Sequence, residues 1–131
     1  MKMIFYDFEV YPDFWGVVFK DYNGKKQVIH SRMNYEEPLN RLLKNVNKFI
    51  FVGLNSNRYD TVMLNYLLQF FKWKDTKQMC KKMFEMSKDI VINNAYTYQL
   101  MADNKVKNRT YEIDLKNYLG AGMGAKEMGC R

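Results

Sequence analysis

Two acidic residues near the start of the chain have the types and spacing that could hold a metal ion. Asp7 and Glu9 lie in Met3–Val10, whose aromatic and branched residues predict a strand ended by Pro12. Side chains alternate along a strand, so both carboxylates point to the same face. Their repulsion is relieved by protonation or by a cation, and Mg²⁺ or Mn²⁺ suits clustered carboxylate oxygens. An edge strand with both acids in solvent is the alternative.

Asp60 is a third candidate. It follows soon after Phe49–Leu54 (FIFVGL), a continuously apolar segment that predicts a strand buried on both faces. A helix is predicted from about Asp60 to Phe71, and an acid at that start is placed to meet carboxylates on a neighbouring strand. Plain N-capping is the alternative, because Asp is a preferred residue at helix starts.

The remaining pattern indicates the elements that must position these acids. A three-strand meander followed by strand–helix–strand crossovers predicts an α/β fold, a mixed sheet with helices on its faces. The polar segment 89–108 gives no clear pattern and is expected to form a loop or a hairpin. The further strands expected are Phe14–Lys20, Gln27–His30 and Tyr111–Leu115, with a hairpin turn at Asn23-Gly24. Two further helices are expected. The first begins at an Asn34 cap, with Glu37 closing a capping box and Pro38 in the first turn. The second begins at a capping box formed by Asp75 and Gln78 and runs through about Ser87.

Two motifs in this framework resemble a known family. The sequence Y-D-F-E-V at 6–10 resembles the first motif of DEDD-type 3′–5′ exonucleases, and N-S-N-R-Y-D at 55–60 resembles the second. The strands W-G-V-V-F-K and Y-E-I-D-L also resemble the N-terminal exonuclease region of phage DNA polymerases. The likeness spans roughly residues 3–119 and implies an RNase H-like fold.

The resemblance implies metal-dependent chemistry at a DNA 3′ end. Asp7, Glu9 and Asp60 would bind Mg²⁺ or Mn²⁺, and in such enzymes two ions ~3.5–4 Å apart activate water and stabilise the leaving oxygen. Glu9 would also help to position the attacking water.

The second motif would supply the residues that bind the strand. Asn55, Asn57 and Tyr59 would lie along the groove for a single-stranded 3′ end, and Arg58 with nearby lysines would contact phosphates. Tyr59 or Phe8 could stack on bases. Core packing at the helix start is the alternative for Tyr59.

The sequence departs from the family at the third motif. A helical Tyr-x-x-x-Asp should supply a fourth acid, but Tyr111 and Asp114 have the wrong spacing and lie on a predicted strand. We therefore expect a truncated or split exonuclease-like domain at residues 1–119, followed by a Gly-rich tail at 120–131. We expect weak catalysis by the chain alone.

The composition of the chain limits which partners and which cellular location are expected. The net charge of +7 favours contact with nucleic acid, although it can serve solubility alone, and it excludes an acidic mimic of DNA. The lysine-rich segment 72–82, which contains Trp73, is either a solvated helix face or a further nucleic-acid contact. Cys80 and Cys130 are expected as free thiols. No apolar run reaches the ~20 residues of a membrane span, which predicts a cytoplasmic protein.

Three functions remain open from the sequence. The first is an exonuclease-like domain that acts on or binds DNA 3′ ends, with single-stranded DNA as partner. The second is a non-catalytic phage protein on this scaffold that inhibits a host defence nuclease, in the manner of an anti-CRISPR protein. The third is a polymerase-associated subunit that completes its site with another chain. Each would act in the cytoplasm of an infected or lysogenic bacterial host.

Overall fold

The computed structural model describes residues 1–54 and 59–118, and in this part the chain forms five strands and four α-helices. The strands are β1 (Lys2–Tyr11), β2 (Phe14–Asp21), β3 (Lys26–His30), β4 (Phe49–Gly53) and β5 (Tyr111–Asp114). The helices are α1 (Glu36–Asn45), α2 (Asp60–Phe70), α3 (Thr76–Val91) and α4 (Thr97–Asp103), with short 3-10 helices η1 (Val46–Lys48) and η3 (Leu115–Tyr118). The expected Gly-rich tail at 120–131 and Cys130 lie outside the described residues.

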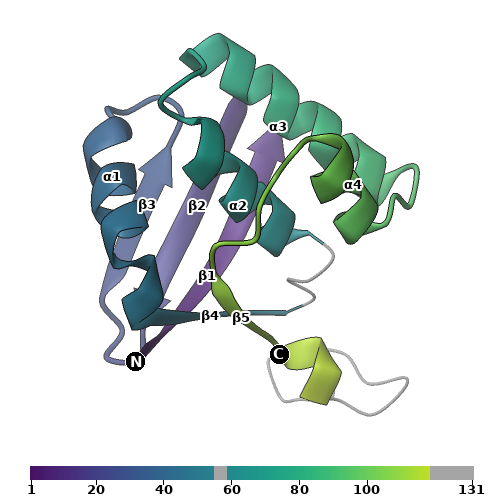
Figure 1. The fold of residues 1–131 in the computed structure, drawn as a ribbon. Coiled ribbons are helices and arrows are strands. Elements are labelled where there is room, and N and C mark those ends of the chain that lie inside the picture. The colour runs from purple at the N-terminus through teal and green to yellow at the C-terminus, as the bar shows by residue number, and fades with distance from the viewer. Residues whose placement is uncertain (55–58, 119–131) are drawn as a thin grey trace.

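The five strands form one mixed sheet in the order β3-β2-β1-β4-β5 (Figure 1). β1, β2 and β3 form an antiparallel meander, whereas β4 runs parallel to both β1 and β5. The predicted fold class, a mixed α/β sheet with a meander, parallel strands and flanking helices, is confirmed. None of the described helices is long and apolar enough to cross a membrane.

The predicted turn between β2 and β3 is also confirmed. Gly24 has a φ of 87°, a left-handed conformation that glycine adopts without strain. The carboxylate of Asp21 accepts the backbone N–H groups of Asn23 and Lys25 at 3.0 and 2.9 Å. The turn therefore fixes the register in which β2 meets β3.

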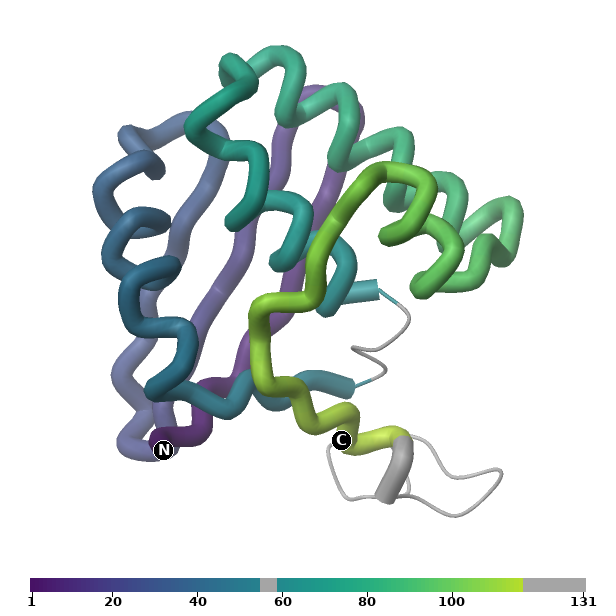
Figure 2. Tube along the Cα trace, viewed as in Figure 1, coloured from purple at the N-terminus to yellow at the C-terminus, as the bar shows by residue number. Residues whose placement is uncertain are grey.

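The core lies between the sheet and its helices. On β1 the side chains of Tyr6 and Phe8 are buried on the face that α2 and α3 cover, together with Phe19 of β2 and Phe51 of β4. α4 packs on α2 rather than on the sheet (Figure 2). The opposite face exposes Phe5, and no described α-helix covers it (Figure 1).

The predicted start of α1 needs correction. α1 begins after Tyr35 without a side-chain cap, so the predicted cap at Asn34 is wrong, although Pro38 does lie in the first turn. Tyr35 is buried against Trp15 with 5.1 Å between ring centroids, and its hydroxyl lies 3.2 Å from that of Thr76. Tertiary packing of Tyr35, rather than a local cap, therefore sets where this helix starts.

The capping box of α3 is confirmed, but its end was predicted too early. Asp75 and Gln78 bond each other's backbone N–H groups, as predicted. The helix continues to Val91 because Ile90 extends its buried face. α4 was missed altogether: only Leu100 is buried in this helix, so the sequence carries little helical periodicity there.

Candidate active site

Asp7 and Glu9 lie on one face of the central strand. β1 is bordered by β2 and β4, so the edge-strand alternative is wrong. Both side chains are nevertheless exposed, on the face that the described helices leave open, and the predicted alternation is confirmed. Partial burial of the Asp7 carboxyl group raises its pKa, and the negative charge of Glu9 raises it further.

Asp60 reaches this strand from the first position of α2. Its Oδ1 atom accepts the backbone N–H of Phe8 at 3.1 Å. β1 pairs with β4 only as far as Phe5, so the Asp60 carboxylate satisfies an N–H beyond the end of that ladder. The acid of the helix therefore binds the residue that stands between Asp7 and Glu9. It is not an N-cap, because no side-chain cap bond is present at this helix start.

The environment of Asp60 disfavours its charge. The residue is 5% exposed, and burial raises its pKa from 3.8 to about 7. The hydrogen bond from Phe8 lowers the pKa, whereas the charges of Asp7, Glu112 and Asp114 raise it. A proton or a cation at this carboxylate would relieve the repulsion.

Tyr59 lies among the three predicted acids. Burial raises its pKa, a hydrogen bond with Ser87 at 2.7 Å lowers it, and the charges of Asp60, Asp7 and Glu9 each raise it. All three acids are thus close enough to act on one phenol. Tyr59 is half-buried and packs against the hydrophobic core, which is one of the two roles considered for it; its contact with nucleic acid stays a prediction.

A groove of about 440 Å³ extends from Glu9 and Tyr59 along α3. Phe84, Ser87 and Lys88 line it, and the Lys88 Nζ lies 5.3 Å from the centre of the Phe84 ring. Sequence reasoning missed these three residues. The only signal was a Phe and a Lys one helical turn apart, which is common on a solvated helix face.

Glu112 of β5 forms a second polar centre, which sequence reasoning also missed. Its carboxylate accepts hydroxyl groups from Tyr6 at 2.6 Å, Thr61 at 3.1 Å and Thr110 at 2.6 Å. We call these four residues the Glu112 cluster. Burial raises the pKa of Glu112, and the three hydroxyl donors lower it. An acid in a short strand gave no sign of this arrangement.

Other predicted site residues have different outcomes. Asn55, Asn57 and Arg58 lie outside the described residues. Phe8 is 5% exposed and belongs to the core, so the suggestion that it stacks on a base is wrong. Asp114 ends β5 as a buried residue and accepts the backbone N–H of Lys116 at 3.0 Å, in agreement with its predicted place on a strand.

Whether a metal ion can bind here depends on which side chains offer ligand atoms to it. Within residues 1–54 and 59–118, no three His, Cys, Asp or Glu side chains are arranged to hold one ion together. Asp7 and Asp60 nevertheless interact electrostatically. Mg²⁺ is commonly held by one or two carboxylates, with waters and substrate phosphates completing its shell. Such a pair fits an ion of that kind, and the predicted three-acid site stays a prediction.

Comparisons of the chain with protein-family models, with curated proteins and with solved structures give no match.

Proposed function

We propose that this chain is an exonuclease-like domain of phage origin that binds the 3′ end of single-stranded DNA and cuts it weakly on its own. The observation that carries the proposal is the hydrogen bond from the Phe8 N–H to Asp60, which joins the helix acid to the strand that bears Asp7 and Glu9. The proposal also rests on the resemblance of both motifs. It places the protein in the cytoplasm of an infected or lysogenic bacterial host.

Each side chain at the site has a role in the proposal. Asp7 and Asp60 would hold Mg²⁺ or Mn²⁺, which supplies water activation and charge neutralisation at a phosphodiester. Glu9 is exposed beside them and would orient the attacking water as a hydrogen-bond acceptor. The raised pKa of Asp60 means that below pH 7 this carboxylate holds a proton and is a poor ligand.

The groove along α3 would receive the terminal nucleotide. Its lining residues include Tyr59 and Phe84, whose rings would offer a base a surface on which to stack. Lys88 is exposed at its side and can pair with a phosphate. The Tyr59–Ser87 hydrogen bond holds the phenol in place, and Tyr59 lines the groove together with Glu9.

Weak cutting follows from the small number of acids. Two-metal catalysis requires enough ligands to hold both ions close together, and a misplacement of about 1 Å can cost ~100-fold in rate. Asp7 and Asp60 can retain one ion, but the helical Tyr-x-x-x-Asp that would hold the other is not in this sequence. Binding would therefore exceed catalysis.

The test uses single-stranded DNA labelled at its 5′ end, incubated with the protein in Mn²⁺ at pH 8 and separated on a gel. We expect salt-sensitive binding with slow shortening from the 3′ end, which Glu9→Gln abolishes and Glu36→Gln, an exposed acid on α1, leaves unchanged. Rapid digestion lost in Glu9→Gln would contradict the weak catalysis. No binding and no shortening would contradict the whole proposal.

A second candidate is the non-catalytic inhibitor of a host defence nuclease. The open face of the sheet favours it, because Phe5 is 39%, Val28 43% and Tyr111 52% exposed there. Exposed apolar groups gathered on one face are typical of protein interfaces. A plating assay on a host carrying a defence nuclease tests this: Glu9→Gln should still protect the phage, whereas Phe5→Glu should not.

A further inference from the structure

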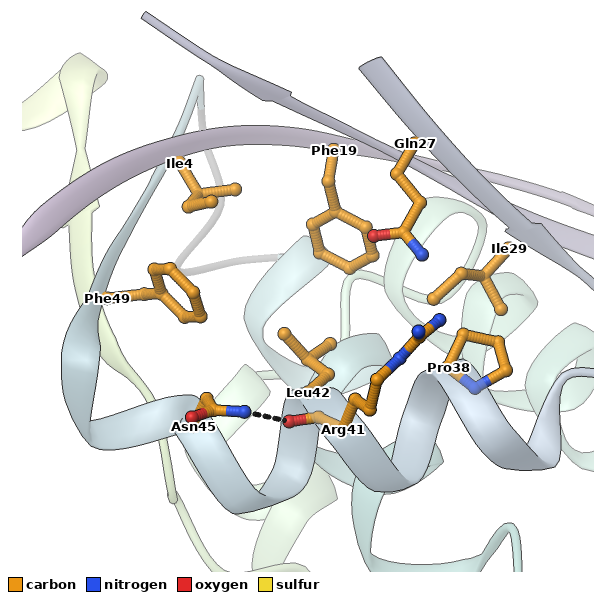
Figure 3. Close-up of a pocket in the computed structure, with 9 residues that line it drawn as sticks. All are labelled: Ile4, Phe19, Gln27, Ile29, Pro38, Arg41, Leu42, Asn45 and Phe49. Carbon is orange, nitrogen blue, oxygen red and sulfur yellow. Dashed lines mark hydrogen bonds between the residues drawn. The ribbon is translucent and has the colours of Figure 1, made fainter. Parts of the chain in front are cut away.

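A pocket of about 160 Å³ lies between α1 and the sheet, near the beginning of β1 (Figure 3), and Asp60 is not among the residues that line it. Phe19 and Ile29 reach into it from the sheet, and Leu42 faces them from α1 (Figure 3). Its other apolar lining residues are Ile4, Pro38 and Phe49. The walls are thus hydrocarbon, while the opening faces solvent.

The size of this pocket indicates its occupant. A cavity of about 150 Å³ accommodates one benzene ring, whereas typical small-molecule pockets begin at about 300 Å³. The pocket therefore fits a single aromatic or branched aliphatic side chain. An anchor side chain of this kind commonly dominates a protein interface.

A second hollow of about 270 Å³ continues the first. The two share Ile4, Phe19, Gln27 and Phe49, so they form one groove, which we call the α1 groove. A groove longer than one side chain suits an extended peptide segment, with its anchor in the deeper pocket and its neighbours along the second hollow.

The border of the α1 groove is positively charged. Arg41 stands at the pocket, and the second hollow is lined by Lys2, Lys20, Lys25 and Lys26. Among the described residues that line the groove, Asp21 is the only acid, and its carboxylate is engaged by the β2–β3 turn.

Two polar side chains at the pocket have no partner of their own. Within the described part of the chain, neither the guanidinium of Arg41 nor the side-chain amide of Gln27 forms a hydrogen bond or an ion pair. A guanidinium pairs with a carboxylate through two parallel hydrogen bonds, which is the strongest form of such a contact. Because the Arg41 guanidinium has no partner among the described residues, it is suited to bind a carboxylate next to the anchor side chain.

We propose that the α1 groove binds an acidic segment of a partner protein, with one Phe or Leu side chain in the pocket and a neighbouring carboxylate on Arg41. The pocket of about 160 Å³ has room for one small ring, and its walls of Ile29, Pro38 and Leu42 beside the two Phe residues suit a single apolar side chain. The proposal is independent of any chemistry at Asp60.

The test measures fluorescence anisotropy with a short fluorescein-labelled peptide of Asp, Glu and Gly that carries one central Phe. Matched probes replace the Phe by Ala, replace the acids by Lys, or use single-stranded DNA of the same charge. We expect the Phe-containing acidic peptide to bind at least about tenfold more tightly than each of the others. Equal binding of the Phe and Ala peptides would overturn the anchor, and tighter binding of the DNA would reassign the groove to nucleic acid.

Two variants with the same change of charge locate the site. Arg41→Glu alters the groove, whereas Lys44→Glu lies on the same helix but does not line it. Both residues are exposed, so both variants should fold. We expect Arg41→Glu to weaken binding about tenfold or more and Lys44→Glu about twofold or less. Equal losses would overturn the proposal, as would NMR shift changes on adding peptide that avoid Ile29 and Phe49.

Discussion

Asp60 is buried and Glu112 is half-buried, and both carboxylates accept hydrogen bonds from β1, yet the donors around them differ. Among the described residues, Glu112 accepts three hydroxyl groups, whereas Asp60 accepts one backbone N–H and faces the charges of three other acids. Burial raises the pKa of both carboxyl groups; three hydroxyl donors lower the pKa of Glu112, whereas the Phe8 N–H lowers that of Asp60. The difference teaches that burial alone does not set how a carboxylate charge is held, because the hydrogen-bond donors around it act on its pKa as well.

The two centres are joined through adjacent residues. Asp60 and Thr61 are consecutive on α2, and one binds the Phe8 N–H while the other donates to Glu112. Tyr6, which also donates to Glu112, is two residues before Phe8 on the same face of β1. The Glu112 cluster therefore holds the start of α2 against β1, and this attachment keeps Asp60 in position.

The largest effect is expected from Asp60→Asn. Because the folded pKa of about 7 exceeds 3.8, the native state loses stability as pH rises between these values, and then no further. At about 1.4 kcal/mol per pH unit the loss approaches about 4 kcal/mol by pH 8. Asn keeps the acceptor for the Phe8 N–H, so urea unfolding at pH 8 should show a gain of up to that amount. The gain should vanish near pH 4.

An Asp60→Asn variant no more stable than the wild type at pH 8 would break the comparison. It would mean that the Asp60 charge is compensated as well as that of Glu112. Asp103→Asn, an exposed acid on α4, is the control and should leave the pH dependence unchanged.

The next largest effect is expected from Glu112→Ala. The change leaves three partly buried hydroxyl groups without their acceptor, and it should destabilise the fold by about 3 kcal/mol. Glu112→Gln keeps one acceptor oxygen and should lose about half as much. Chemical denaturation at pH 7 checks both, and a stabilised Glu112→Ala would show that this acid is strained like Asp60.

A smaller loss is expected from Tyr6→Phe. The variant keeps the buried ring among Phe8, Phe19 and Phe51 but removes the 2.6 Å bond to Glu112, which should cost about 2 kcal/mol. Double-mutant cycles with Glu112→Ala should show that the two losses do not add, because they remove the same bond. Additive losses of stability would mean that the Tyr6 hydroxyl and Glu112 do not stabilise the fold through a shared bond.

The smallest effect is the response to Mn²⁺. An ion at ten times its dissociation constant stabilises a protein by about 1.4 kcal/mol, so the melting temperature should rise in the wild type and hardly move in Asp7→Ala. The rise should be larger at pH 8 than at pH 6, where a proton competes for Asp60. An equal rise in both proteins would mean that the ion binds elsewhere.

Local signals predicted much of the fold. Alternation placed Asp7 and Glu9 on one face of β1, the Asn23-Gly24 pair marked the hairpin, and Asp75 with Gln78 marked the start of α3. Each of these features depends on residues within a few positions of one another, so the local sequence is sufficient to predict it. The start of α1 and the presence of α4 depend on long-range packing, and both predictions failed there.

The sequence by itself determined that two acids share one face of a strand, that a third follows a buried strand, and that the sheet is mixed. Only the tertiary structure decided which acid lies against which donor. The Phe8–Asp60 bond joins residues 52 positions apart, and the Tyr6–Glu112 bond joins residues 106 positions apart. A local sequence pattern does not show which distant hydroxyl or N–H group will face a carboxylate. That pairing nevertheless decides whether an acid in the interior serves as a hydrogen-bond acceptor or attracts a proton or a cation.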